Sequence, residues 1–195
     1  MHGFIHLPDH QYFEDFLHLK SAGEIFIDVG CYDGFTALEF IKRYPDYEAI
    51  HVFEPEPMNM AYVKKCLQEY PRIFYHDIGL SNQAQILRFK SQGSSSCATN
   101  DGDILIKVDR LDDILTSPIT YIKMDIEGGE IMALEGAKQS IVKYHPHLAI
   151  SVYHRVDDLW HIPQLILSFW DDYRIFLRHY TEGVTETVMY FVPVK

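Results

Sequence analysis

Short, uninterrupted apolar runs alternate with helix-length segments along most of the chain, and this alternation constrains the fold more than any other feature. Such runs are typical of parallel strands that are covered on both faces, because neither face meets water. The expected strands are residues 25–29, 49–53, 73–76, 121–124 and 148–153. The expected helices are residues 36–43, 59–70, 110–115, 130–143 and 162–170. The sequence therefore predicts an α/β fold with a mostly parallel sheet and helices on both faces.

The C-terminal part of the chain adds two further strands, at residues 173–177 and 187–192, with a turn near Glu182 and Gly183. A connection this short joins antiparallel strands, because a parallel crossover needs about a dozen residues or more. We therefore expect a seven-stranded sheet in which one strand, supplied by this hairpin, runs antiparallel to the others.

Two segments interrupt the alternation. Residues 83–109 contain strand-like runs at 86–89 and 105–108 around a polar tract rich in Gly and Ser, which predicts a small β-hairpin insertion. Residues 1–23 predict a short amphipathic helix, capped by Asp9, that packs into the core or closes over a site as a lid. The apolar face of this helix carries Tyr12, Phe13, Phe16 and Leu17.

The charge and composition of the chain restrict the classes of partner that the protein can bind and the compartment that suits it. Lys and Arg number 17 against 28 Asp and Glu, a formal net charge of -11, so nucleic acid and anionic membranes are poor partners. No apolar stretch approaches the ~20 residues of a membrane span, and no secretory signal is visible. Three widely spaced cysteines without a CxxC pair suit a reducing compartment. We expect a cytoplasmic protein of one domain, residues 1–195. The sequence is also compatible with a homodimer.

A glycine turn follows the first strand and contains Asp28, Gly30, Tyr32, Asp33 and Gly34. Glycines at such a place let a ligand approach the backbone, although the same pattern also serves a plain strand-to-helix turn. The spacing departs from the dinucleotide fingerprint GxGxxG. Two carboxylates here oppose a pyrophosphate and favour a cationic ligand such as S-adenosylmethionine (SAM). An NAD-dependent oxidoreductase is therefore the alternative interpretation.

The second and third strands end in further candidate cofactor ligands. Glu54 lies about 20 residues beyond the glycine turn, where a carboxylate can accept hydrogen bonds from both ribose hydroxyls of an adenosine. Pro55 and Pro57 stiffen this segment and fix the direction of the carboxylate. Asp77 follows the third strand and can contact the exocyclic amine of adenine, although acids at strand ends also serve as caps.

Four segments, taken in order, resemble the FkbM family of SAM-dependent methyltransferases. These segments are residues 26–30 (FIDVG), 53–57 (FEPEP), 122–130 (IKMDIEGGE) and 150–154 (ISVYH). The resemblance runs from Glu24 to the C-terminus. It implies a Rossmann-like class I methyltransferase fold, SAM held by Asp28, Gly30 and Glu54, and O-methylation of a hydroxyl on a sugar or natural-product-like small molecule. Cys31 stands where many members have a small residue.

Three side chains at the ends of the fourth and fifth strands are the catalytic candidates: Lys123, Asp125 and His154. A lysine inside a buried strand needs a carboxylate or a cleft, so a structural ion pair and a catalytic or acceptor-orienting role both stay open. Asp125 also faces the expected cofactor site. An imidazole such as His154 can take a hydroxyl proton near neutral pH, and its alternative role is a structural hydrogen bond.

A divalent cation is possible but not required by the sequence. Asp125 together with Asp157 or Asp158 offers oxygen ligands of the kind Mg²⁺ prefers, but a helix cap is the favoured role of the last two. A third interpretation of the whole chain is a non-catalytic module that binds SAM or a partner through residues 91–103.

Overall fold

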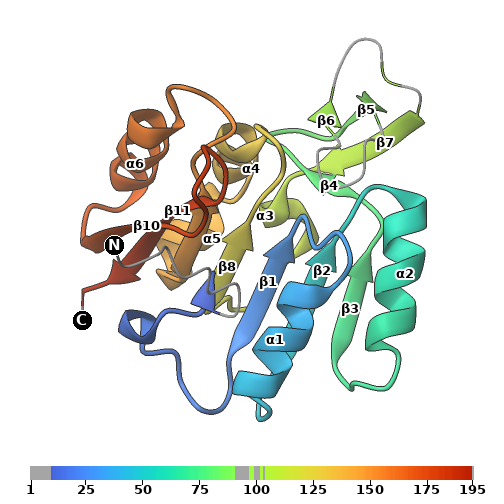
Figure 1. Ribbon diagram of the computed structural model, residues 1–195, viewed down its shortest axis with the longest axis horizontal. Coiled ribbons are helices and arrows are strands. Elements are labelled where there is room, and N and C mark those ends of the chain that lie inside the picture. The colour runs from blue at the N-terminus through green and yellow to red at the C-terminus, as the bar shows by residue number, and fades with distance from the viewer. Residues whose placement is uncertain (1–9, 91–96, 99–101, 103, 195) are drawn as a thin grey trace.

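The computed structural model describes residues 10–90, 97–98, 102 and 104–194. Its main sheet has seven strands in the order β10-β11-β9-β8-β1-β2-β3 (Figure 1). The strands are β1 (Ile25–Val29), β2 (Ala49–Phe53), β3 (Ile73–His76), β8 (Tyr121–Met124), β9 (His147–Ser151), β10 (Tyr173–His179) and β11 (Thr187–Pro193). All seven were expected from the sequence, with bounds that differ by a few residues.

The pairing of the strands follows the predicted pattern. β1 pairs in parallel with β2 and β8, β2 with β3, and β8 with β9. β11 lies between β9 and β10 and runs antiparallel to both. The strand order reverses between β1 and β8, and open sheets of this kind bind ligands beyond the strand ends at such a point.

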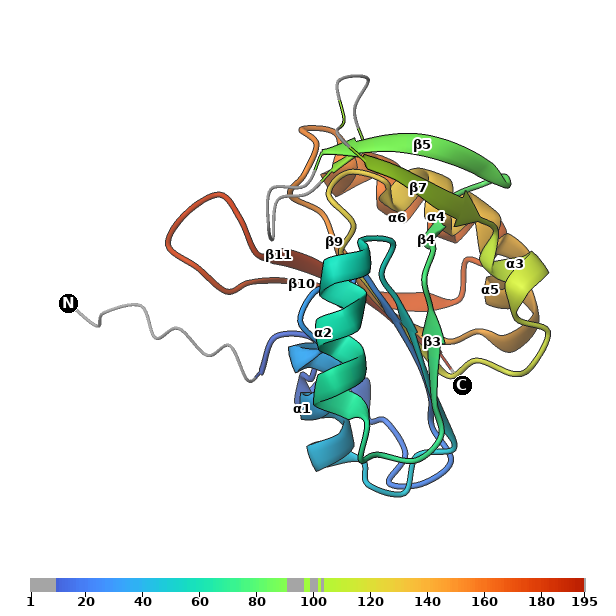
Figure 2. The ribbon, with the colours of Figure 1, turned by 90° about the vertical axis from the view of Figure 1, so that its right-hand side faces the viewer.

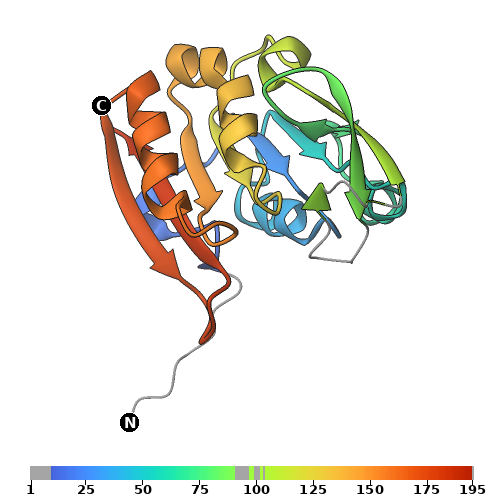
Figure 3. The same cartoon turned by 90° about the horizontal axis from the view of Figure 1, so that it is seen from above.

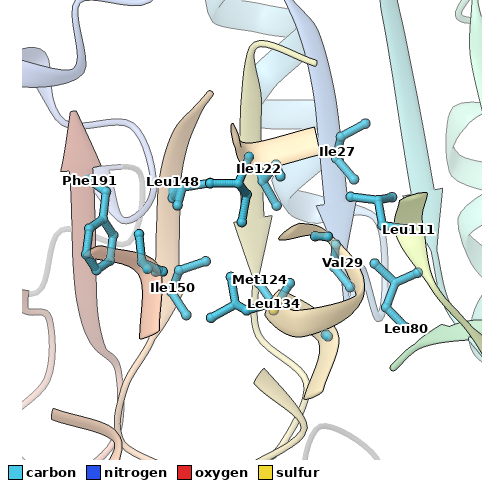
Figure 4. Close-up of a cluster of buried hydrophobic side chains, with 14 of the residues drawn as sticks. Ile27, Val29, Leu80, Leu111, Ile122, Met124, Leu134, Leu148, Ile150 and Phe191 are labelled. Carbon is cyan, nitrogen blue, oxygen red and sulfur yellow. The ribbon is translucent and has the colours of Figure 1, made fainter. Parts of the chain in front are cut away.

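Helices cover both faces of the sheet (Figure 3). They are α1 (Phe35–Arg43), α2 (Pro57–Leu67), α3 (Leu111–Ile114), α4 (Glu130–Gly136), α5 (Lys138–Tyr144) and α6 (Asp158–Phe169). Side chains of α3, α4, α5 and α6 form one apolar core with the sheet, which contains Ile122, Leu134 and Ile150 (Figure 4). Side chains of α1, α2 and the N-terminal segment form the core on the opposite face.

The expected helix at 130–143 is two helices, α4 and α5, that meet at Ala137. Gly136 ends α4 against a neighbouring loop, since a Cβ on Gly136 would lie 2.0 Å from the carbonyl oxygen of Ser81. α6 begins four residues earlier than predicted and accommodates Pro163. None of the helices in the described part of the chain is long and apolar enough to cross a membrane.

The insertion, together with residues 79–80 ahead of it, forms a second, smaller sheet with the order β4-β7-β5-β6 (Figure 2). Its strands are β4 (Gly79–Leu80), β5 (Gln85–Lys90), β6 (Cys97–Ala98) and β7 (Ile104–Asp109). β5 and β7 pair antiparallel, as the sequence predicted for a hairpin. The sequence did not predict β4, because two residues are too short to show a period.

The predicted N-terminal α-helix is wrong. Within residues 10–24 the chain forms a turn at residues 10–12 and a 3-10 helix, Asp15–Leu17, and Tyr12 and His18 adopt positive φ angles of 71° and 48°. Tyr12, Phe13 and Leu17 are buried, as expected, but they reach the core from an irregular segment. Asp9, the expected cap, lies outside the described residues. Aromatic contacts with the sheet override the helical spacing, since Phe13 packs against the rings of both Phe26 and Phe40.

Candidate functional site

A cavity of about 540 Å³ opens at the carboxyl ends of β1, β2, β8 and β9. This volume lies within the range of small-molecule sites in proteins. The turns after β1 and β2 form one wall of the cavity, and the N-terminal segment and the tip of the β10–β11 hairpin form the other. The cavity therefore lies where the sequence placed the ligand site.

The glycine turn after β1 needs glycine at two positions. Gly30 has a φ of 75°, and a Cβ there would lie 1.9 Å from the carbonyl oxygen of Asp125, so no other residue fits. Its N–H donates to the carbonyl of Phe53 at 3.0 Å, which holds the turn against β2. Gly34, with a φ of 79°, opens α1 but does not itself line the cavity. Gly30 thus brings backbone to the cavity wall where a side chain would block it.

A buried ion pair lies under this turn. The ammonium of Lys123 is 3.2 Å from Asp28 Oδ1 and donates to the carbonyl of Gly30 at 2.7 Å. Burial opposes the charged ammonium, but the carboxylates of Asp28 and Asp125 outweigh it and raise the pKa of Lys123. Asp28 is fully buried and does not line the cavity, so it acts on the site through Lys123. The pair fixes the glycine turn.

Glu54 is buried and points at the same turn. Its Oε2 accepts the N–H of Tyr32 at 3.1 Å, and its Oε1 accepts the N–H of Glu56 at 2.9 Å. Burial raises the pKa of Glu54, and these two N–H donors oppose that shift. Each oxygen keeps a further lone pair, so the carboxylate can still accept two hydroxyl donors from the cavity. Pro55 lines the cavity directly after it.

The structure contradicts the role expected for Asp77. Both of its carboxylate oxygens accept hydrogen bonds from the ammonium of Lys64, at 2.8 Å and 3.0 Å. The Asp77 side chain is 64% exposed, and the residue does not line the cavity. The ammonium of Lys64 on α2 pairs with this carboxylate at the surface, away from the cavity.

Asp125 faces the glycine turn from the end of β8. Its Oδ2 accepts a hydrogen bond of 2.8 Å from the hydroxyl of Tyr12, and its Oδ1 lies 3.4 Å from the hydroxyl of Tyr153. Burial and the nearby Asp125 charge raise the pKa of both tyrosines, so each stays a neutral donor. Two segments far apart in sequence therefore orient one cavity carboxylate.

His154 lies behind Asp125 and outside the cavity lining. Its Nδ1 is 2.9 Å from Glu130 Oε1, and its Nε2 is 3.3 Å from Asp125 Oδ1 and 3.6 Å from Glu127 Oε2. Burial lowers the pKa of the ring, but the three carboxylates outweigh it and raise the pKa to about 9. The ring is then protonated at neutral pH, which does not fit the role of general base that the sequence suggested.

Within the described residues, the side chains of Asp125, Glu130 and His154 form the one group with metal-ligand spacing, their ligand atoms lying within 4.8 Å of one another. Each ring nitrogen of His154, however, faces a different carboxylate. An imidazolium has an N–H on both ring nitrogens and can therefore face two carboxylates at once. A histidine that binds a metal needs a free lone pair on the binding nitrogen. The group therefore fits a charged histidine better than a metal centre.

The expected cation ligands Asp157 and Asp158 have other partners. Asp158 Oδ2 accepts the backbone N–H of Arg155 at 2.8 Å and ties the start of α6 to the preceding loop. Asp157 faces the ring of His161 at 3.0 Å, one turn along the same helix. Neither belongs to the group around Asp125, so the structure does not bring Asp157 or Asp158 together with Asp125, and the side chain of Asp157 makes no capping hydrogen bond at the start of α6.

The tip of the β10–β11 hairpin also lines the cavity, which the sequence did not predict. Thr181, Thr185 and Glu186 contribute to its wall. Glu186 has a positive φ of 61°, and its Oε2 accepts a hydrogen bond of 2.5 Å from Gln11. No sequence signal links positions 11 and 186, because their contact depends on the whole fold. Tyr12 and Tyr153 were also not predicted as site residues.

Comparison with known proteins agrees with this architecture. The crystal structure of Methyltransferase FkbM from Methylobacillus flagellatus KT superimposes with a TM-score of 0.82 and 33% sequence identity, and covers 94% of this chain and 47% of that one. Aeropyrum pernix fibrillarin, solved with natively bound S-adenosyl-L-methionine, shares the fold at a TM-score of 0.54 and 14% identity, over 88% of this chain and 67% of that one.

A curated relative points the same way. The 2-O-methyltransferase NoeI of Sinorhizobium fredii (strain NBRC 101917 / NGR234) is 22% identical over 151 residues, which is 64% of this chain and 62% of that protein. This chain spans less than two thirds of the length of NoeI and of the Methylobacillus protein. Residues 28–182 match the Methyltransferase FkbM domain, so the chain belongs to the FkbM methyltransferase family.

Proposed function

We propose that this protein transfers a methyl group from SAM to a hydroxyl oxygen of a small molecule of the sugar or natural-product kind. The observation that carries this proposal is the pairing of Glu54 with the Gly30 turn in a cavity that also presents an oriented carboxylate, Asp125, directly beside that turn. A domain of the FkbM methyltransferase family and the 2-O-methyltransferase activity named for NoeI support it.

The cofactor end of the cavity fits SAM in its donor set. Gly30 and Tyr32 offer close backbone, Glu54 offers two acceptor oxygens for the ribose hydroxyls, and Pro55 offers an apolar surface. Asp28 and Lys123 hold the turn from beneath. When bound, SAM supplies an electrophilic methyl group on a sulfonium. A domain such as fibrillarin, which binds this molecule on the same fold, supports the assignment.

At the other end, the chain's own residues position the acceptor. Asp125 accepts a hydrogen bond from the acceptor hydroxyl and takes its proton, because it lines the cavity directly beside the Gly30 turn, where the methyl donor is expected to bind. Tyr12 donates to this carboxylate and fixes its direction, and the protonated ring of His154 holds it from behind. Positioning of the hydroxyl supplies much of the rate of such a transfer.

The two alternatives from the sequence have less support. An NAD-dependent oxidoreductase has to place a pyrophosphate beside Asp33 and Glu54, both of which line the cavity. A non-catalytic module acting through residues 91–103 rests on a segment that lies largely outside the described residues. One domain over residues 1–195, a cytoplasmic location, a homodimer and the absence of a nucleic-acid partner remain predictions.

Calorimetric titration with SAM and with its demethylated product SAH tests the proposal. We expect binding by the wild-type protein and an affinity at least about tenfold weaker in Glu54→Ala, because hydrogen bonds to a charged acceptor are lost. Glu48→Ala removes an exposed acid ahead of β2 and serves as the matched control. A folded wild-type protein that binds neither SAM nor SAH overturns the proposal, and binding without transfer to any hydroxylated acceptor favours the non-catalytic module.

A further inference from the structure

We propose that the acceptor end of the cavity selects substrates by charge, taking hydroxyls on neutral or amine-bearing molecules and excluding carboxylated or phosphorylated ones. Glu186, at the tip of the β10–β11 hairpin, is the residue that sets this preference. The inference rests on the proposed function, because the position of SAM defines which end of the cavity receives the acceptor.

The cavity lining is strongly acidic. Its carboxylates are Asp33, Glu54, Asp125, Glu127 and Glu186. Among the described lining residues, Lys123 is the one lysine or arginine, and its ammonium is already held by Asp28 and by the carbonyl of Gly30. Bound SAM adds a single net positive charge, and the protonated ring of His154 lies beside Asp125 and Glu127, so these two positive charges face five lining carboxylates.

Two stretches of the sequence that lie largely outside the described residues add acidic side chains and no lysine or arginine. Residues 1–9 and residues 91–103 contain no lysine and no arginine, and they add the acidic residues Asp9, Asp101 and Asp103. A site for an anionic acceptor needs an arginine or lysine to pair with it, since an unpaired buried anion is strongly disfavoured. The described lining residues therefore favour an acceptor that is not an anion.

Glu186 lies in the cavity wall, where its charge can act on a bound acceptor. It lies on the wall that the N-terminal segment and the hairpin tip build together, because Gln11 Nε2 donates to Glu186 Oε2 across 175 residues of sequence. Its φ of 61° is unusual for a residue other than glycine, and such conformations gather at functional sites.

The rest of this wall is neutral. Thr181 and Thr185 line it, and the hydroxyl of Thr181 donates to the carbonyl of Thr185 at 2.8 Å. Tyr12 and Tyr153 present neutral phenols, because burial and Asp125 raise the pKa of both. Hydroxyl and carboxylate acceptors on this wall suit a polyol or an amine. Glu186 is thus the charged group on this wall. Its negative charge favours an acceptor that carries an amine over one that carries a carboxylate.

A charge-matched panel of probes tests the proposal. The probes are methyl glucoside, its 2-amino analogue and its 6-carboxylate analogue, titrated by ligand-observed NMR against protein saturated with SAH. We expect the amine to bind at least about tenfold more tightly than the carboxylate, with the neutral glycoside between them, and the ratio to shrink as salt is added. Failure of SAH itself to bind counts against the proposed function and not against this inference.

Two variants separate Glu186 from the general acidity of the protein. Glu186→Gln is expected to reduce the amine-to-carboxylate ratio by about threefold or more while leaving SAH affinity unchanged, because it removes one charge and keeps the shape. Glu182→Gln removes an exposed charge from the same hairpin tip, away from the cavity lining, and is expected to change neither value. A carboxylate probe that binds as tightly as the neutral one, no binding by any probe to SAH-loaded protein, or an unchanged ratio in Glu186→Gln overturns the inference.

Discussion

The hydroxyl of Tyr12 donates a hydrogen bond of 2.8 Å to Asp125, a residue 113 positions further along the chain. The backbone N–H of Tyr12 in turn donates to the hydroxyl of Tyr190 on β11 at 3.0 Å. The Tyr12 ring also lies over the ammonium of Lys123, with 5.3 Å between the charge and the ring centroid. The N-terminal segment is thus part of the site.

Tyr12→Phe is expected to lower the free energy of unfolding by about 1–3 kcal/mol, because the half-buried carboxylate of Asp125 loses one of its donors. Tyr144→Phe also removes one hydroxyl hydrogen bond, to the carbonyl of Thr116, but on the surface. We expect a smaller effect from Tyr144→Phe in urea denaturation. Equal losses in the two variants argue against a special role for the Tyr12 hydroxyl.

Gly30→Ala is expected to destabilise the protein by more than about 3 kcal/mol or to prevent folding, because its Cβ collides with the carbonyl oxygen of Asp125. Gly23 has a similar φ of 77°, but a Cβ there meets no atom within 4 Å. Gly23→Ala therefore isolates the cost of the backbone conformation, about 1 kcal/mol. Denaturant unfolding of the pair measures the collision alone, and a mild Gly30→Ala is inconsistent with the close approach.

Lys123→Met is expected to cost about 3–5 kcal/mol in unfolding free energy, because Asp28 is left charged and buried without a partner. The double variant Asp28→Asn/Lys123→Met removes both charges and is expected to recover part of the loss. A double-variant cycle by chemical denaturation gives the coupling between the two side chains. Additive effects contradict a direct ion pair.

The pH dependence of stability reports on His154. Its pKa in the folded protein is about 9, above the ordinary value of 6.5. A raised pKa contributes stability that is fully present below about pH 6.5 and is lost as the pH rises through about 9. The stability difference between wild type and His154→Gln should therefore shrink by about 2 kcal/mol over that window.

Thermal and urea unfolding at several pH values measure this difference. His161→Gln is the control, because His161 is exposed and faces a single carboxylate, Asp157, at 3.0 Å. Solvent screens such a pair, so its removal should leave the pH profile as in wild type. A stability gap between wild type and His154→Gln that widens towards alkaline pH contradicts a protonated His154.

Asp77→Ala is expected to leave SAM affinity unchanged, because its carboxylate is exposed and paired with Lys64. The result contrasts with Glu54→Ala in the same calorimetric assay. A loss of SAM binding in Asp77→Ala shows that the Lys64 pairing breaks when the cofactor binds.

The centre of the sheet was predictable from the sequence because β1, β2, β8 and β9 are buried on both faces. A run such as Ile25–Val29 has no room for polar alternation, and Gly30 directly after it marks the ligand turn. The position of Glu54 in the cavity lining was predictable for the same reason, since it follows the buried run of β2, and its role as a cofactor ligand stays a prediction.

The rest of the site depends on contacts that no local pattern encodes. Tyr12, Phe13, Phe16 and Leu17 have helical spacing, yet their partners lie on β1, α1 and β11 and hold the segment in an irregular path. Asp77 is a reasonable adenine ligand by its position in the sequence, but its carboxylate accepts a hydrogen bond from Lys64 on α2. His154 is a reasonable base by position, but three carboxylates from one loop and helix surround its ring.

The position of β11 bears on how the protein is made. β11 lies between β9 and β10 and pairs with both. Residues 187–193 therefore have to leave the ribosome before β9 and β10 can join one sheet. Until then β9 presents an unpaired row of backbone groups, which is a template for aggregation. Nascent chains halted just before Thr187 should therefore need chaperones and be cut readily by proteases, whereas chains extended past Pro193 should resist both.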